Sequence, residues 1–244
     1  MMCRNKEKAE AAREEIKKKS GNDNIDILIV DLASLKSVRN VAENFKSKYD
    51  KLHVLINNGG VFNFERVVTE DGYESTFAVN YLSHFLLTNL LLDVIEKSAP
   101  SRIINLSSDI HKFFKINMED LMSEKNYKSQ KAYSYSKFAL VLHAYALARK
   151  LEGKKVAVNV IHPGHAATQM TQPTGRVSKF ILSRMGITPE EAAKTSIHVA
   201  SSPEVGEITG KYFKKCKAAN SHKWTHDDYL QNRLWKISEE LVNI

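Results

Sequence analysis

The sequence has little cysteine: two residues, Cys3 and Cys216, among 244. A single pair provides no disulfide framework, and this usage is typical of a protein from a reducing compartment. Neither cysteine combines with His111 or His162 in the paired spacing that a zinc site requires. We therefore expect no metal site, two structural histidines and a cytoplasmic protein.

Long apolar runs are also missing. A helix that spans a bilayer needs about 20 apolar residues, whereas the longest candidate, 85–95, contains Thr88, Asn89 and Asp93. No signal peptide is visible. The net charge of +8 would suit nucleic acid, but the one dense cluster, 17–19, closes a predicted helix, where positive charge favours the dipole. We expect a solvated basic surface and no nucleic-acid partner.

Helical and strand patterns alternate along the chain. We expect helices at 5–19, 34–49, 71–96, 188–200 and 234–241, another that carries Tyr133 and reaches 151, and strands at 25–30, 53–56, 103–106, 156–161 and 210–213. This alternation predicts an α/β fold with a parallel sheet covered by helices on both faces. Because there is no repeat or linker, we expect one domain over 1–244.

Tyr133 and Lys137 are four residues apart in a predicted helix, so their side chains leave the same face one turn apart. A phenol has a pKa of about 10, and a nearby cation lowers it by favouring the phenolate. The pair is therefore suited to moving a proton. The spacing alone is not decisive, because Tyr127 and Lys131 repeat it and a surface tyrosine beside a solvated lysine has the same pattern.

Three upstream segments accompany this pair. The strand 102–106 is followed by Ser107 and Ser108, the run 54–60 ends in an Asn-Asn-Gly-Gly turn, and Asn80 is an amide in an apolar helical stretch. Together with the Tyr-Lys pair, they resemble the short-chain dehydrogenase/reductase family. The resemblance runs from residue 1 to about 225 and implies a Rossmann-like doubly wound sheet.

The spacer between Ser108 and Tyr133 indicates a branch of that family. It is long and contains His111 and Asp120-Leu121. In this respect the chain looks most like the retinol-dehydrogenase-like branch.

The resemblance implies a role for each catalytic candidate. Tyr133 would be the general acid in carbonyl reduction and the general base in alcohol oxidation. Lys137 would lower the pKa of Tyr133 and bind the nicotinamide ribose, and Ser108 would donate to the substrate oxygen. Ser107 ranks second, because strand alternation sends it the opposite way. Asn80 would hold a water that links Lys137 to solvent, or would be a helix amide bonded to backbone.

The resemblance also implies cofactor contacts at the ends of two strands. Asn57 and Gly59 belong to a turn whose usual sequence in the family is Asn-Asn-Ala-Gly. In this chain Gly59 stands in place of the alanine, and a glycine makes the turn more flexible. Asp31 matches an acidic residue that contacts adenine. A buried aspartate at the end of a strand could equally cap the helix that begins at Ser34.

Further along, Pro163, Gly164 and Thr168 match the family's segment around the nicotinamide carboxamide. The sequence Gly-His-Ala-Ala-Thr over 164–168 departs from the commoner apolar pattern. The following segment, 170–185, mixes polar and apolar residues, and we expect it to cover an apolar substrate.

Arg4 indicates the choice of cofactor. An acid at the end of the second strand of this fold would pair with a ribose 2′-hydroxyl, whereas an arginine suits a 2′-phosphate. The segment 3–5 contains no acid, so we expect NADP(H). The alternative is an exposed arginine at the start of a helix.

The sequence lacks the strand and glycine-rich turn that begin the family's fold and hold the pyrophosphate. We expect an N-terminally truncated sheet whose first strand and helix are absent, with that strand missing from the centre. The chain would then be a fragment or, less in line with its motifs, a shortened product with impaired cofactor binding.

These patterns predict an NADP-dependent oxidoreductase that interconverts an alcohol and a carbonyl on a small lipophilic substrate, such as a retinoid, steroid or aldehyde. The alternative is a truncated, non-catalytic fragment or isoform that acts, if at all, by binding a partner. The sequence leaves membrane association and homo-oligomer formation open.

Overall fold

The computed structural model describes residues 1–164 and 188–244. Its helices are α1 (Lys6–Ser20), α2 (Leu35–Lys48), α3 (Ser75–Phe77), α4 (Ser83–Leu90), α5 (Leu92–Lys97), α6 (Ser129–Lys150), α8 (Pro189–Ser201) and α9 (Asp228–Val242), with a π-helical turn η1 (Ala78–Leu82) and 3₁₀ turns η2 (Asp109–Lys112), η4 (Pro203–Val205) and η5 (Lys223–His226). Its strands are β1 (Met2–Cys3), β2 (Leu28–Ile29), β3 (Val54–Asn57), β4 (Ser101–Leu106), β5 (Val156–His162), β6 (Tyr212–Lys214) and β7 (Lys217–Ala219).

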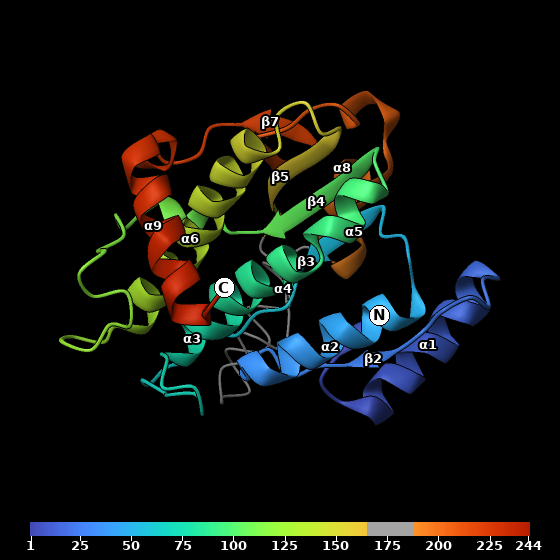
Figure 1. Cartoon of the computed structure of the whole chain (residues 1–244), viewed down its shortest axis with the longest axis horizontal. Coiled ribbons are helices and arrows are strands. Elements are labelled where there is room, and N and C mark those ends of the chain that lie inside the picture. The colour runs from blue at the N-terminus through green and yellow to red at the C-terminus, as the bar shows by residue number, and fades with distance from the viewer. Residues whose placement is uncertain (165–187) are drawn as a thin grey trace.

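The described strands form two sheets. Five strands follow the order β3-β4-β5-β6-β7, in which β3 to β6 are parallel and β7 is antiparallel to β6. The other two, β1 and β2, pair in parallel with each other. Helices cover both faces of the larger sheet, as Figure 1 shows for α6 and α8. The predicted Rossmann-like α/β fold is confirmed.

Alternating side chains explain the two covered faces of the larger sheet. Ile103 and Val158 point into a core that α2, α4, α6 and α9 share. Their neighbours Ile104 and Ile161 are on the opposite face, in a smaller core with Val199 of α8. Because the central strands β4 and β5 are buried on both faces, apolar residues in them face both cores.

The two sheets part between β1 and β3, and the described residues place no strand there. Val54 and Ile56 of β3 are 37% and 42% exposed, and Ile29 of β2 is 48% exposed. These exposures are unusual in a parallel sheet, whose strands are normally buried on both faces. Helix α2 packs on α4 and so connects the smaller sheet to the main body (Figure 1).

The helix predicted at 71–96 is interrupted, so that expectation is wrong in detail. After the short α3, the chain makes the π-helical turn η1, continues as α4, and breaks at Leu91 (φ −100°, ψ 0°) before α5. π-Helical turns are rare and frequently occur at functional sites. Here the turn contains Asn80, and the apolar pattern of 71–96 carried no sign of it.

The predicted helix starts at Ser34 and Thr188 are confirmed: Ser34 accepts a hydrogen bond from Ser37 N–H, and Thr188 accepts one from Glu191 N–H. Three other details differ. The strand predicted at 25–30 is reduced to β2, the terminal helix begins earlier, at Asp228, and β7 was not predicted. In the described part of the chain, no helix is long and apolar enough to cross a membrane.

Two histidines are buried in the larger core. His143 is 2% exposed, packs against Phe85 and Trp235, and forms no hydrogen bond within the described residues. His84 Nε2 donates to the carbonyl of Gly59, and its Nδ1 forms no hydrogen bond within the described residues. Burial lowers the pKa of His143 to about 3 and that of His84 to about 4. Both are therefore neutral at physiological pH.

We predict that His143→Phe stabilises the protein and weakens its acid sensitivity. An unfolded histidine titrates near pH 6.5, so the unfolded chain binds protons that the folded His143 rejects, and stability falls as the pH drops from about 6.5 towards 3. Removing two unsatisfied ring nitrogens is expected to contribute about 1–3 kcal/mol. Urea unfolding at pH 7.5 and pH 5.5 measures this. His53→Phe, at an exposed histidine, is the control, and an equal effect of both variants would contradict the prediction.

Candidate active site

Helix α6 is attached by two hydrogen bonds to the end of β4 and by a third to η2. Ser107 Oγ donates to the carbonyl of Lys137 at 2.8 Å, and Lys137 Nζ donates to the carbonyl of Leu106 at 2.9 Å. One turn earlier, Ser134 Oγ donates to the carbonyl of Ile110 at 2.8 Å. The helix face that carries Tyr133 and Lys137 therefore lies against the segment that contains Ser108, as the sequence predicted.

Tyr133 and Lys137 lie together, and burial dominates their titration. Lys137 Nζ is 5.6 Å from the centroid of the Tyr133 ring, and the ring of Phe62 packs on Tyr133 edge to face at 5.4 Å. Burial raises the pKa of Tyr133 to about 12 and lowers the pKa of Lys137 to about 8. The expected lowering of the tyrosine pKa by Lys137 is thus outweighed by removal of the phenol from water.

The alternative pair, Tyr127 and Lys131, does not form. The Tyr127 hydroxyl donates to the carbonyl of Asn63 at 2.8 Å, and Lys131 Nζ lies 5.3 Å from the ring of Tyr135 instead. Of the two tyrosines with this spacing, Tyr133 is the one placed beside the end of β4.

The two serines after β4 point to different partners, as alternation predicted. Ser107 is 3% exposed, and its hydroxyl is used in the bond to α6. Ser108 is partly exposed, and its Oγ accepts the N–H of Ile110 at the start of η2. That contact leaves the Ser108 hydroxyl proton available to a substrate oxygen.

Asn80 connects the loop after β3 to α6. Its Oδ1 accepts the N–H of Val61 at 2.7 Å, and its Nδ2 donates to the carbonyl of Val61 at 3.0 Å and to Ser136 Oγ at 3.0 Å. Backbone bonding was the alternative reading of this amide, although the partner here is a distant loop. The π-helical turn η1 positions the side chain for these contacts.

The turn after β3 comes very close to these side chains. A Cβ on Gly60 would lie 3.1 Å from Asn80 Oδ1 and 3.6 Å from Lys137 Nζ. A Cβ on Gly59 would meet only the end of the Leu32 side chain closely, at 2.5 Å. Gly60, which the sequence-based prediction omitted, is therefore the glycine that allows the turn to approach the side chains of Asn80 and Lys137.

Asn57 and Asp31 both make local structural contacts. Asn57 is 2% exposed, and its Nδ2 donates to Thr88 Oγ1 at 3.0 Å and to Asn105 Oδ1 at 2.9 Å. The Asp31 carboxylate accepts the N–H of Ala33 at 3.0 Å, in the turn just before α2. The side chain of Asn57 thus fixes β3 to β4, and cofactor contacts of either residue stay predictions.

The remaining predicted cofactor residues follow the ends of strands. Arg4 is exposed directly after β1, and Pro163 and Gly164 follow β5, with Gly164 at a φ of 92°. Thr168 and the predicted cover at 170–185 lie outside the described residues.

Most of the candidates therefore meet at one edge of the fold. In parallel strands, carboxyl ends share an edge, and open α/β sheets bind ligands there. Gly60, Ser108 and Pro163 follow β3, β4 and β5 at that edge, and Arg4 follows β1 of the smaller sheet. A cavity of about 750 Å³ lies at the opposite edge, where Pro100, Lys155 and Gly210 precede strands, and is not part of this site.

A sheet of this order with a Tyr-Lys pair beside a strand-end serine defines an α/β oxidoreductase site. The family model described as short chain dehydrogenase matches residues 1–178, and the chain belongs to that family. Within it, the chain falls in the retinol-dehydrogenase-like branch. Retinol dehydrogenase 14 of Mus musculus is 41% identical and aligns with 100% of this chain and 78% of its own length.

Two solved structures have the same fold. An uncharacterised protein from Mycobacterium paratuberculosis matches with a TM-score of 0.76 and 26% identity, covering 100% of this chain and 83% of that chain. The Pseudomonas aeruginosa RhlG/NADP active-site complex matches with a TM-score of 0.66 and 25% identity, covering 86% and 82%.

We predict that Gly60→Ala lowers activity far more than Gly59→Ala. The new methyl group at position 60 would lie 3.1 Å from Asn80 Oδ1 and so displace the side chain that bonds to Val61 and Ser136. A displacement on the order of 1 Å can cost about 100-fold in rate. At position 59 the flexible end of Leu32 can turn away. Steady-state kinetics with both variants measures the difference. Equal rates for the two, with melting temperatures unchanged, would show that the close approach of Gly60 has no catalytic value.

Proposed function

We propose that this oxidoreductase interconverts an alcohol and a carbonyl by NADP-dependent hydride transfer on a small lipophilic substrate. The main support for this proposal is that α6 is hydrogen-bonded to the segment from Leu106 to Ile110. These bonds bring the helix face of Tyr133 and Lys137 to the segment that contains Ser108. We also infer that 1–244 acts as one domain, since the candidates come from both of its sheets.

The titration of the pair suits proton donation. Because burial holds the pKa of Tyr133 at about 12, the phenol keeps its proton at neutral pH and can give it to a carbonyl oxygen that receives a hydride. Lys137, with a pKa of about 8, is mainly an ammonium at pH 7 and stabilises the phenolate that remains. The nicotinamide, when bound, supplies or accepts the hydride.

The other side chains support this transfer. The Ser108 hydroxyl would donate to the same substrate oxygen and stabilise its developing charge. Asn80 holds the loop of Val61 and the hydroxyl of Ser136 in place. A water beside Asn80 that leads to Lys137 would complete a proton path.

The residues at the carboxyl edge suit a dinucleotide. Gly60 lets the backbone come close, and the exposed guanidinium of Arg4 is the kind of group that binds a 2′-phosphate. The NADP complex of a related fold supports this choice of cofactor. Asp31, Asn57, Gly59, Pro163, Gly164 and Thr168 are proposed as further contacts.

The proposed substrate class rests on relatives. The name retinol dehydrogenase belongs to an enzyme 41% identical to this chain, and retinol is a small lipophilic alcohol. We propose a substrate with a similar chemistry, namely an apolar body and a terminal alcohol or aldehyde.

We predict that Tyr133→Phe lowers turnover by about 10²–10⁴-fold, because it removes the hydroxyl that exchanges the proton. Affinity for NADPH should change little. Tyr127→Phe is the matched control, since this tyrosine has the same spacing to a lysine but bonds to Asn63. Turnover of an aliphatic aldehyde and NADPH fluorescence titration give the two measurements.

Two results would argue against the proposal. If Tyr133→Phe turned over as fast as Tyr127→Phe, the tyrosine would have no role in proton transfer. If the folded wild-type chain bound neither NADPH nor NADH, the non-catalytic alternative would be favoured over the enzyme.

We predict that Arg4→Glu lowers NADPH affinity by about 10- to 100-fold and leaves NADH affinity similar or higher. A charged hydrogen bond to the 2′-phosphate contributes about 1.5–3 kcal/mol, and the variant replaces it with repulsion. Fluorescence titration with both cofactors measures the ratio. Lys18→Glu makes the same charge change at an exposed residue in the last turn of α1, and an equal loss of NADPH affinity in both variants would refute specific recognition by Arg4.

A further inference from the structure

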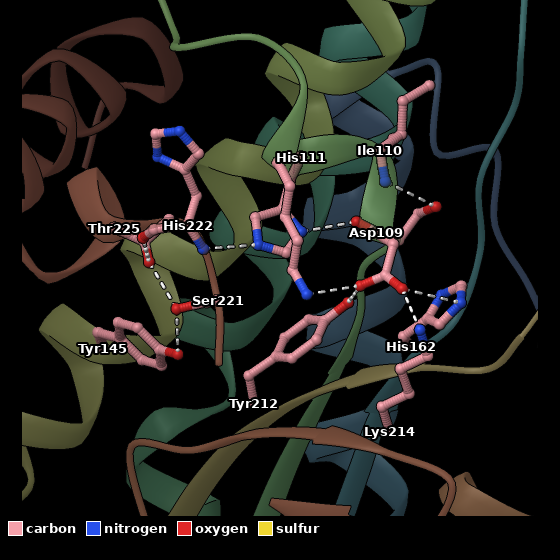
Figure 2. Close-up of polar contacts among 12 residues, drawn as sticks. Asp109, Ile110, His111, Tyr145, His162, Tyr212, Lys214, Ser221, His222 and Thr225 are labelled. Carbon is pink, nitrogen blue, oxygen red and sulfur yellow. Dashed lines mark hydrogen bonds and ion pairs between the residues drawn. The ribbon is translucent and has the colours of Figure 1, made fainter. Parts of the chain in front are cut away.

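Asp109 directly follows Ser108 and has no role in the proposed proton transfer, yet it is the centre of a dense polar cluster (Figure 2). Its Oδ2 accepts a hydrogen bond from Lys214 Nζ at 2.6 Å and lies 3.7 Å from His162 Nε2. Its Oδ1 accepts the Tyr212 hydroxyl at 3.0 Å and pairs with Lys112 Nζ at 3.0 Å. The carboxylate therefore uses both oxygens on four side chains.

These four partners come from three different elements. Lys112 is in η2, His162 ends β5, and Tyr212 and Lys214 belong to β6. His162 and Lys214 are also partners in the register of β5 and β6. Asp109 thus ties the chain after β4 to the carboxyl ends of the next two strands. His162, the residue of β5 that Asp109 contacts, directly precedes Pro163 and Gly164, which are proposed to contact the nicotinamide.

Ser108 is held from its other side by His111. The Nδ1 of His111 is 2.6 Å from the carbonyl of Ser108, and its Nε2 accepts the N–H of His222 at 3.2 Å (Figure 2). A carbonyl can only accept and an N–H can only donate, so these contacts require the neutral tautomer with hydrogen on Nδ1. Burial lowers the pKa of His111 to about 4, which agrees with a neutral ring.

The charge balance keeps the cluster intact near neutral pH. Partial burial opposes ionisation of Asp109, but hydrogen bonds from Lys214 and Lys112, together with His162 and Tyr212, lower the pKa of its carboxyl well below the usual range. The side chain of Asp109 is only 19% exposed, so these contacts are less screened than ordinary surface ion pairs.

We propose that Asp109 is a positioning residue, which fixes the distance between the Ser108 hydroxyl and the turn His162–Gly164. The proposal rests on the proposed function, because Ser108 would bind the substrate oxygen and this turn would face the nicotinamide. The cluster then sets how the carbonyl carbon meets the hydride, while Asp109 itself touches neither reactant. Such alignment affects the rate of the chemical step more than binding.

The first experiment compares Asp109→Asn with Asp93→Asn in the full chain. Asp93 forms a remote surface ion pair with Lys46 at 2.8 Å and supplies the matched control. We expect Asp109→Asn to lower kcat about 10-fold, with KM and NADPH affinity within about 2-fold of the wild type. Asp93→Asn should retain the wild-type kcat. Equal kcat values for the two variants, or a loss confined to KM, would overturn the proposal.

Variants of Lys214 separate positioning from a general loss of structure. Lys214→Arg keeps a cation in reach of Asp109, whereas Lys214→Met removes it. We expect Lys214→Met to lower kcat and Lys214→Arg to retain most of it. The kcat of the double variant Asp109→Asn/Lys214→Met should be no lower than that of the poorer single variant, because each substitution removes the same contact between Asp109 and Lys214. Multiplicative losses in the double variant would contradict the proposal.

A readout without turnover distinguishes this proposal from the proposed function. Hydrogen exchange followed by mass spectrometry should show about 10-fold faster exchange in peptides over 107–113 and 161–164 for Asp109→Asn, and no change there for Asp93→Asn. Unchanged exchange at both segments would overturn the positioning role. If the wild type lacked turnover and NADPH binding while this exchange pattern held, the proposed function would fail and the link between these two segments would stand.

Discussion

A buried ammonium constrains the whole site. Lys137 is 4% exposed, and an unpaired charge in such a position would be strongly unfavourable. Its Nζ donates to the carbonyl of Leu106, the last residue of β4, and this bond ties α6 to the end of that strand. The bonds from Ser107 and Ser134 fix the same geometry. Tyr133, one turn before Lys137, is consequently brought to the serines that follow the strand.

Because the strands form two separate sheets, the two parts of the candidate site are held in place by different elements. Gly60, Ser108 and Pro163 follow β3, β4 and β5, which are hydrogen-bonded neighbours, and α6 is bonded to the end of β4. Arg4 and Asp31 follow β1 and β2, which connect to the main body through α2 packed on α4. Arg4 would bind the 2′-phosphate end of the dinucleotide, and the nicotinamide end would lie beside β4 and β5. The spacing between these two binding regions therefore depends on helix packing as well as on the hydrogen bonds between strands.

Much of the fold could be predicted because its signals are local. Alternating apolar segments gave the α/β class, and Ser34 and Thr188 marked helix starts by a side chain that bonds to N–H three residues on. The Tyr133-Lys137 spacing needs only one helical turn, so it too was visible. Ser108 was preferred over Ser107 because alternation along a strand is strict.

The missed features depend on contacts between distant residues. The π-helical turn at Asn80 forms where that amide reaches Val61 and Ser136, and no local pattern encodes such partners. Gly60 matters because of what surrounds it, and Asp109 because β5 and β6 bring His162 and Lys214 to it. Burial was missed for the same reason: the sequence shows a cation near a phenol but not that both leave water.

The burial of Tyr133 and Lys137 affects the proposed proton transfer. In water the two groups titrate near pH 10, with lysine slightly higher. Burial separates them, with Tyr133 raised to about 12 and Lys137 lowered to about 8, so the ground state holds a neutral phenol beside an ammonium. The ammonium has no lone pair to accept the tyrosine proton, so in the proposed reaction the phenol would give up its proton only to a strong base. An alkoxide formed on the substrate by hydride addition would be such a base, so under the proposed function the burial that opposes a free phenolate would couple proton release to the chemical step.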